Sequence, residues 1–174
     1  PGIFPVQDES TEVYVSALNL LPRREHSRHE LRRKLLSRYP NRQVVAGEVL
    51  VRLERESYQS DERFAEAYVR SWGAKGKGVQ RLRQELRARG IEESLIEQVL
   101  SPLSDADAAM KRILLVWQKK FAQPPRDIQE KHRQMRFLLY RGFRQEEVER
   151  LFLHLRENPS APREEGIQPV TTIE

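Results

Sequence analysis

The chain has 174 residues, of which 33% are charged, 38% are hydrophobic and 7% are aromatic, a composition that suits thin cores between helices better than one large globule. Its net charge of +5 and its pI of about 9.7 favour nucleic acid, acidic protein surfaces or anionic membranes as partners. The absence of cysteine excludes disulfides and thiolate metal sites, and no apolar run approaches the ~18 residues that span a bilayer.

The two ends of the chain are predicted to be tails. Residues 1–10 are rich in proline and glycine and then turn acidic, and they lack the basic and apolar regions of a signal peptide. Residues 157–174 contain Pro159, Pro162 and Pro169 without apolar periodicity, which predicts disorder. We therefore expect a cytoplasmic protein that does not enter the membrane.

Between the tails nearly every segment has helical periodicity. A first helix is predicted from Val13 to Leu21, and Ser27 followed by Glu30 has the pattern of a capping box at the start of the next helix. Ser60–Asp61 is a further candidate cap. The short valine runs between residues 44 and 51 lie within a helical charge pattern and are weak strand signals.

A repeat with a period near 50 residues appears when the helices are aligned. When residues 82–100 are aligned with the residues 52 positions later, eight positions form pairs. Seven of these pairs keep the same physical type of side chain, and the pair of Leu82 and Gln134 does not. The aligned sets are Leu82, Leu86, Arg89, Gly90, Ile91, Ile96, Val99 and Leu100, and Gln134, Leu138, Arg141, Gly142, Phe143, Val148, Leu151 and Phe152. Leu31, Leu35 and Arg38 continue the pattern, with Tyr39–Pro40 in place of the glycine.

The repeated glycines predict how the middle helices end. An Arg-Gly-apolar terminus places Gly90 and Gly142 in the left-handed conformation, so that Ile91 and Phe143 fold back on the last turn. The sequence therefore predicts an all-α protein built from tandem three-helix repeats in an elongated, curved array. We expect repeats at 11–59, 60–103 and 104–156, and a monomer.

Basic residues concentrate in the middle helix of each repeat. Residues 23–38 contain seven basic and two acidic side chains, residues 70–89 seven and one, and residues 111–136 eight and two. The third helices lean the other way, through Glu54 and Glu56, Glu92, Glu93 and Glu97, and Glu146, Glu147 and Glu149. For any one basic helix, a solvated face with i,i+4 pairs is the simpler interpretation. The recurrence of this polarity in three repeats favours the alternative that, if the middle helices line one side of the array, they form a basic track for phosphates or an acidic partner.

Catalytic and metal-binding patterns are not found. His26 and His29 are expected to be a surface pair without the carboxylates of a metal site, and no nucleophile elbow or H-E-x-x-H is present. The loop 75–78 contains two lysines and two glycines but not a full P-loop pattern, so it predicts a helix connection or a single phosphate contact. The aromatic residues, which are suited to base stacking in principle, are expected to pack in the cores: Tyr58, Tyr68, Trp72, Trp117 and Tyr140. We expect no enzyme and no cofactor.

Three stretches of the chain have a familiar order and spacing: residues 20–36 read LLPRREHSRHELRRKLL, residues 58–91 read YQSDERFAEAYVRSWGAKGKGVQRLRQELRARGI, and residues 137–143 read FLLYRGF. In these stretches the chain resembles the RecX family of bacterial recombinase regulators. The likeness spans roughly residues 13–155, and the motifs are specific in this order and spacing. The chain departs from the family at residues 57–59, where Ser-Tyr-Gln replaces the common Gly-Tyr-Leu, and in the short loop 39–44.

The resemblance implies tandem three-helix repeats and a regulator without catalytic residues. RecX-like proteins bind RecA filaments on single-stranded DNA and inhibit their growth and activities, so a RecA filament is the expected partner, with DNA contacted directly or through the filament. The basic helices supply the candidate contact residues Arg28, Arg32, Lys75, Lys77, Arg81, Arg133 and Arg136. The alternative is a nucleic-acid-binding helical module that acts without a recombinase.

Overall fold

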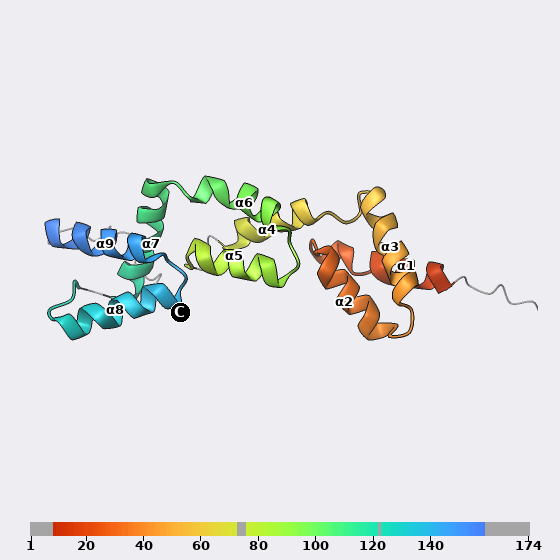
Figure 1. Cartoon of the computed structure of the whole chain (residues 1–174), viewed down its shortest axis with the longest axis horizontal. Helices are drawn as coiled ribbons and strands as arrows, with labels where there is room; N and C mark the ends of the chain where they lie inside the picture. The colour runs from red at the N-terminus through yellow and green to blue at the C-terminus, as the bar shows by residue number, and fades with distance from the viewer. Residues whose placement is uncertain (1–8, 73–75, 122, 159–174) are drawn as a thin grey trace, which may run out of the picture.

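The computed structural model describes residues 9–72, 76–121 and 123–158. Within these ranges the chain forms nine α-helices and no strand, which confirms the all-α prediction. Figure 1 shows an elongated array in which consecutive groups of three helices follow one another along the long axis. No helix in the described ranges is long and apolar enough to cross a membrane.

The first repeat contains α1 (Glu9–Leu18), α2 (Arg28–Arg38) and α3 (Gln43–Arg55). α1 packs on α3, and α2 covers both. The short valine runs lie inside α3, as the charge pattern indicated. The buried side chains of this core are Val13, Ala17, Leu31, Leu35, Ala46, Val49, Leu50 and Leu53.

The second repeat contains α4 (Asp61–Trp72), α5 (Val79–Ala88) and α6 (Glu93–Leu100). It has its own core, in which Phe64, Tyr68 and Trp72 follow one another along α4 with ring centroids 5.7 Å apart at each step. Aromatic side chains at i, i+4 and i+8 lie on one face of a helix, so α4 presents a continuous aromatic edge to the rest of its repeat.

The third repeat contains α7 (Ala106–Lys120), α8 (Ile128–Tyr140) and α9 (Gln145–Glu157). Gln134, which broke the repeat pattern, is only 3% exposed and occupies a core position like that of Leu82. Its side-chain oxygen accepts a 2.8 Å hydrogen bond from the indole nitrogen of Trp117. The polar group is tolerated because a buried donor and a buried acceptor satisfy each other.

The helix ends agree with the local sequence signals. The hydroxyl of Ser27 accepts a hydrogen bond from the backbone nitrogen of Glu30, which is one half of the predicted capping box, whereas the Glu30 carboxylate pairs with Arg24 and Arg89. Ser60 caps α4 through the nitrogen of Arg63. Gly90 and Gly142 have φ angles of 75° and 88°, which confirms the predicted left-handed ends of α5 and α8. The residues after them are buried and bond back to the last turn.

Several local predictions are wrong. α1 begins at Glu9, inside the expected tail, and ends at Leu18 because Pro22 belongs to a separate 3-10 turn (Leu21–Arg23). Tyr58 and Tyr140 are exposed instead of packed in cores. His26 is buried rather than on the surface. Glu157 is helical, and the rest of the predicted C-terminal tail, from residue 159, lies outside the described residues.

Ser57 ends α3 in a left-handed conformation that glycine normally adopts. Its φ angle is 60°, and the nitrogen of Tyr58 bonds to the carbonyl of Leu53 in the same six-residue closure seen after α5 and α8. An L-residue in this region costs about 1–2 kcal/mol. This is one of the positions at which the sequence departs from the glycine common in the family it resembles.

Replacement of Ser57 should change stability in a defined order. Ser57→Gly removes the strain but adds unfolded-state freedom, so we expect a gain of about 0.5 kcal/mol. Ser57→Val should cost about 1 kcal/mol because a β-branched side chain resists positive φ. Urea unfolding measures both. Ser37→Gly, in exposed helical backbone, is the control, and its free energy of unfolding should fall by about 0.5 kcal/mol. A fall in both glycine variants would contradict backbone strain at Ser57.

Candidate partner-binding surface

The middle helices of the three repeats lie in a row. Figure 1 shows α8, α5 and α2 following one another along one edge of the array, with the remaining helices on the other side. Of these helices α2 has five lysines and arginines, and α5 and α8 have three each. Four of the eight basic residues counted between 111 and 136 lie instead in α7, so the basic character of the third repeat is shared by its first and middle helices. The middle helices do lie along one edge, which is the condition for a basic track.

The joint between α8 and α5 is made by backbone hydrogen bonds. The nitrogen of Gly78 donates to the carbonyl of Arg141 at 2.8 Å, and that of Gln80 donates to Gly142 at 3.2 Å. The unpaired N–H groups at the start of α5 thus bond to the unpaired carbonyls at the end of α8. The positive end of one helix dipole meets the negative end of the other, which stabilises the row.

This joint has no room for side chains. A Cβ atom added to Gly78 would lie 2.2 Å from the carbonyl carbon and oxygen of Gly142, and one added to Gly142 would lie 2.4 Å from the Cβ of Arg81. Both contacts are far below van der Waals distance and involve atoms that cannot rotate away. The two glycines are therefore required by the close approach of the helices as well as by turn geometry.

The joint between α5 and α2 uses side-chain and backbone groups together. The hydroxyl of Ser27, which begins α2, donates to the carbonyl of Arg89 at the end of α5 at 2.8 Å. Gly90 packs against the side chain of His29. The backbone nitrogen of Arg28 donates to the carboxylate of Asp61 at 2.7 Å, so α4 also holds the start of α2.

A chain of ion pairs runs along the row from α2 into α5. Glu30 pairs with Arg24 at 2.8 Å and with Arg89 at 3.5 Å, and Arg89 pairs with Glu85 at 3.7 Å. Glu85 also pairs with Lys77 at 3.6 Å. Linked pairs of this kind hold several side chains in one arrangement, which isolated surface pairs do not.

Tyr68 anchors this network from α4. Its hydroxyl donates to Glu85, and the guanidinium of Arg89 lies 4.5 Å from the centre of its ring. Burial and the bond to Glu85 raise the pKa of Tyr68 to about 12. The phenol therefore stays protonated near neutral pH and acts as a hydrogen-bond donor.

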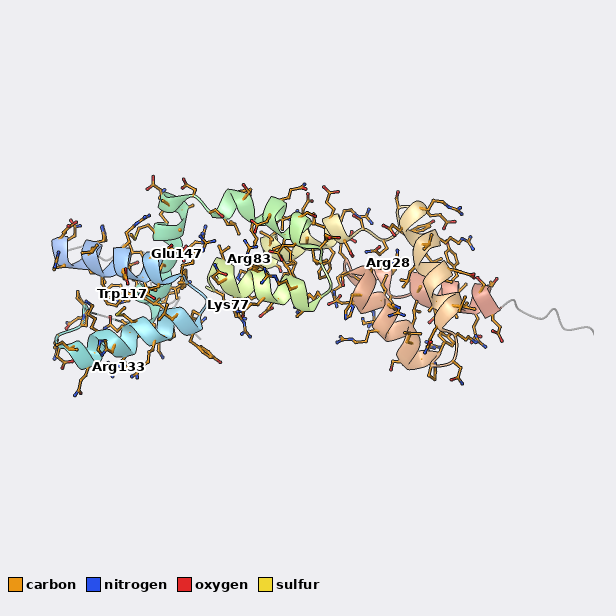
Figure 2. The ribbon with its side chains drawn as sticks, viewed as in Figure 1. Arg28, Lys77, Arg83, Trp117, Arg133 and Glu147 are labelled. Atoms are coloured by element: carbon orange, nitrogen blue, oxygen red, sulfur yellow. The ribbon has the colours of Figure 1, made fainter. Side chains whose placement is uncertain are left out.

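The acidic third helix of repeat 2 engages much of the charge of α5. Arg83 is only 13% exposed and pairs with Glu93 and Glu97 of α6, and Arg87 pairs with Glu93 at 2.7 Å. The hydrogen bond from Arg83 holds the pKa of Glu97 below its usual range. Figure 2 marks Arg83 in the middle of the array, where α5 and α6 meet. These arginines serve the packing of the repeat.

The predicted contact residues divide into two groups. Arg28 pairs with Glu54 at 2.5 Å, Lys77 lies 4.4 Å from the ring of Trp72, and Arg81 pairs with Glu85 at 3.3 Å. These three side chains have structural partners that a binding partner would have to displace. Lys75 lies outside the described residues.

The other predicted residues are exposed on α2 and α8. Arg32 and Arg136 have no ion pair in the part of the chain that the structure describes, and Arg133 is 4.0 Å from Glu130, the limit of a pair. Figure 2 shows Arg133 pointing outward from α8. Within the row, the available positive charge therefore lies mainly on its two outer helices.

Tyr140 is a surface feature that the sequence prediction assigned to a core. It is 86% exposed in the last turn of α8, beside the joint with α5. Leu138 is fully buried, and a residue two positions later on a helix points to the opposite side. The helical phase of α8 was therefore the signal that could have placed Tyr140 on the surface.

The described residues contain no metal-binding cluster. No group of three histidine, aspartate or glutamate side chains lies close enough to hold a metal ion within them. What the geometry provides is a row of helices with charged side chains along one edge of an elongated array. The fold thus defines an all-α helical-repeat protein.

Comparison with known proteins identifies the family. Models of the first, second and third three-helix domains of RecX match residues 14–53, 60–100 and 107–152. The chain is 40% identical to the regulatory protein RecX of Pseudomonas putida (strain GB-1) over 147 residues, covering 84% of this chain and 92% of that protein. For the Ralstonia pickettii protein of the same name, the identity is 35% over 148 residues, with coverages of 85% and 91%.

Solved structures share the fold. RecX from Lactobacillus salivarius superposes with a TM-score of 0.76 at 20% identity, over 87% of this chain and 99% of that one. A second RecX crystal structure gives a TM-score of 0.69 at 24% identity, over 83% and 73% of the two chains. The chain belongs to the RecX family, whose members are regulatory proteins and not enzymes.

Gly78→Ala should open the joint between α5 and α8. The new methyl group meets backbone atoms that cannot move without parting the helices, so we expect a loss of about 2–3 kcal/mol with helix content nearly unchanged. Urea unfolding and circular dichroism measure the two quantities. Gly47→Ala, in α3 with nothing near its Cβ, is the control and should gain about 1 kcal/mol. Equal effects at both glycines would disprove the role of the joint.

His26 should make stability depend on pH. Its Nδ1 donates to the carbonyl of Arg24 and its Nε2 accepts from Lys34, both at 2.9 Å, which fixes the neutral ring. Burial, followed by the charges of Arg24 and Lys34, lowers the pKa of His26, while Glu30 opposes this shift. Stability is then complete above the unfolded pKa near 6.5 and is lost as pH falls through the folded pKa.

The measurement is the urea midpoint between pH 7.5 and 5. One group contributes a slope of at most about 1.4 kcal/mol per pH unit. His26→Gln should remove this component of the slope, whereas His132→Gln, at an exposed position, should leave it in place. A slope that survives His26→Gln would assign the pH dependence to other groups.

Proposed function

We propose that this protein binds RecA filaments on single-stranded DNA and inhibits their extension, ATP hydrolysis and strand exchange. The proposal rests on membership of the RecX family and on one structural observation. That observation is the row of α2, α5 and α8, joined end to end by hydrogen bonds and carrying exposed arginines on its outer helices.

The row supports binding along a periodic partner. Helices of 11, 10 and 13 residues arranged end to end extend for roughly 50 Å at 1.5 Å per residue, without the joints. We expect a row of this length to contact neighbouring subunits of a filament. A repeat protein that bridges neighbouring subunits inhibits by blocking addition at a growing end or by holding a less active arrangement.

The exposed charges supply attraction and orientation. Arg32 and Arg136 are available on the first and last helices of the row, and each such contact is worth at most about 1 kcal/mol. Several weak contacts along one row act together because they are held on a single folded scaffold. The structure thus favours many modest contacts over a single strong one.

A second candidate function is nucleic-acid binding without a recombinase. Tyr140 favours it, since an aromatic ring 86% exposed next to basic helices can stack on a base, at about 1–3 kcal/mol. Binding of this kind would weaken steeply with salt. It predicts that the protein binds single-stranded DNA alone at near-physiological salt.

Charge reversal on the row should weaken inhibition of RecA. We expect Arg32→Glu with Arg136→Glu to raise the half-inhibitory concentration in DNA-dependent ATP hydrolysis about tenfold, through loss of two contacts and added repulsion. Arg55→Glu with Arg150→Glu, exposed arginines on α3 and α9, makes the same change in net charge away from the row. This control should inhibit like the unchanged protein.

The same titration separates the candidate functions. Inhibition at protein levels too low to coat the DNA supports a filament regulator. Inhibition only at DNA saturation, together with loss of DNA binding in Tyr140→Ala, supports the nucleic-acid module. Equal weakening by the row variant and its control would show that net charge alone matters and would remove the row from the mechanism.

A further inference from the structure

A cavity lies between the second and third repeats, apart from the exposed arginines of the row. Its volume is about 170 Å³. Its apolar wall combines both repeats with Leu103 from the segment between them, and includes Val69, Trp72 and Leu82 from one side and Val116 and Phe143 from the other. A cavity of about 150 Å³ with apolar walls accommodates a benzene-sized group, so this one has room for a single apolar side chain.

Three cations surround this apolar cavity. Lys77, Arg112 and Lys119 line it, and no carboxylate is found among the described residues of its lining. Lys77 is already paired with Glu85, which leaves Arg112 and Lys119 as the main source of positive potential. An apolar hollow with a cationic rim attracts a ligand that combines an apolar group with negative charge.

Arg112 is a partly buried cation of this rim that has no paired carboxylate among the described residues. Its guanidinium is partly buried, and its hydrogen bond is to a neutral group, the carbonyl of Leu103 at 2.5 Å. Burial lowers the pKa of Arg112, with Glu147 and Asp105 offering only long-range compensation. A partly buried charge without a paired carboxylate is unfavourable, and a carboxylate placed beside it recovers that cost.

Trp72 contributes its ring to the same wall. Its indole nitrogen is buried and has no hydrogen-bond partner among the described residues, whereas that of Trp117 is bonded to Gln134. Because this nitrogen is closed off from solvent, it does not face the cavity, and the polar case for a ligand rests on Arg112 and Lys119.

The chemistry of the cavity selects among ligands. A free phosphate would leave the apolar wall unfilled, and a neutral apolar molecule would leave Arg112 without its counter-charge. We propose that the cavity binds one apolar side chain, of about the size of leucine or phenylalanine, from an acidic segment of a partner protein whose carboxylates pair with Arg112 and Lys119. This site does not depend on the filament contacts proposed above.

Binding there would act on the shape of the array. Because the wall comes from both repeats, an inserted side chain contacts Val69 and Leu82 on one side and Val116 and Phe143 on the other. Such a ligand restricts the angle between the two repeats. A partner could thereby select one curvature of the helix row.

The test uses the full-length chain labelled with ¹⁵N and a short capped peptide in which one phenylalanine has two aspartates on each side. The readout is the pair of indole N–H signals from Trp72 and Trp117, assigned with Trp72→Phe. We expect the Trp72 signal to shift in a saturable way while the Trp117 signal stays in place, since Trp117 is bonded to Gln134 in the core of repeat 3.

Matched variants test each part of the site. Leu115→Glu places a carboxylate at the cavity and should weaken the peptide at least about tenfold, whereas Leu153→Glu, a leucine of similar exposure (49% against 53%) outside the cavity, should not. Lys119→Glu should weaken binding more than Lys111→Glu on the same helix. Replacing phenylalanine by glycine in the peptide should abolish the Trp72 shift.

Several results would overturn the proposal. One is the absence of any Trp72 shift at millimolar peptide, and a second is equal weakening of binding by both leucine variants. A third is equal binding of the glycine peptide, which would reduce the effect to general electrostatics. A shift of Trp72 caused by a thymidine oligonucleotide but not by the peptide would reassign the cavity to nucleic acid. Failure of RecA inhibition would leave this peptide result unaffected, so the two proposals are tested separately.

Discussion

The close approach of α8 and α5 is the constraint on which the arrangement of the molecule depends. Two backbone hydrogen bonds, from Gly78 to Arg141 and from Gln80 to Gly142, place the start of one basic helix on the end of the next. They form only because both positions near the contact lack a side chain. With this joint in place, α8 and α5 form one continuous row of helices. Without it, the basic residues of each repeat would form separate surfaces.

The two joints of the row differ in chemistry. The α8–α5 joint is mainly backbone to backbone, whereas the α5–α2 joint depends on Ser27 and on an ion-pair network around Glu30 and Arg89. Each repeat meanwhile buries its own apolar core. A repeat array of this kind has a core in each unit and separate contacts at its joints, and the buried His26 and the cavity beside Trp72 lie at different joints.

The basic residues are divided between structure and binding. Arg83, Arg87 and Arg89 pair with carboxylates within or between repeats, so the central helix contributes less available charge than its composition suggests. Exposed cations lie on α2 and α8 and around the cavity between repeats 2 and 3, and also on α3 and α9, which carry Arg55 and Arg150. Attraction toward an acidic or phosphate-bearing partner is thereby distributed along the array, which suits recognition of an extended partner more than of a small ligand.

The sequence by itself determined the helices, their caps and the repeat, because these depend on contacts three to five residues apart: Leu82 with Leu86, Ser27 with Glu30, and Gly90 with the turn before it. Only the tertiary structure decided that Arg28, Lys77 and Arg81 have structural partners, that His26 is buried, and that Gly78 meets Gly142. Those outcomes depend on which distant segments approach each other, and a linear pattern of charge or hydrophobicity does not encode the distance between them.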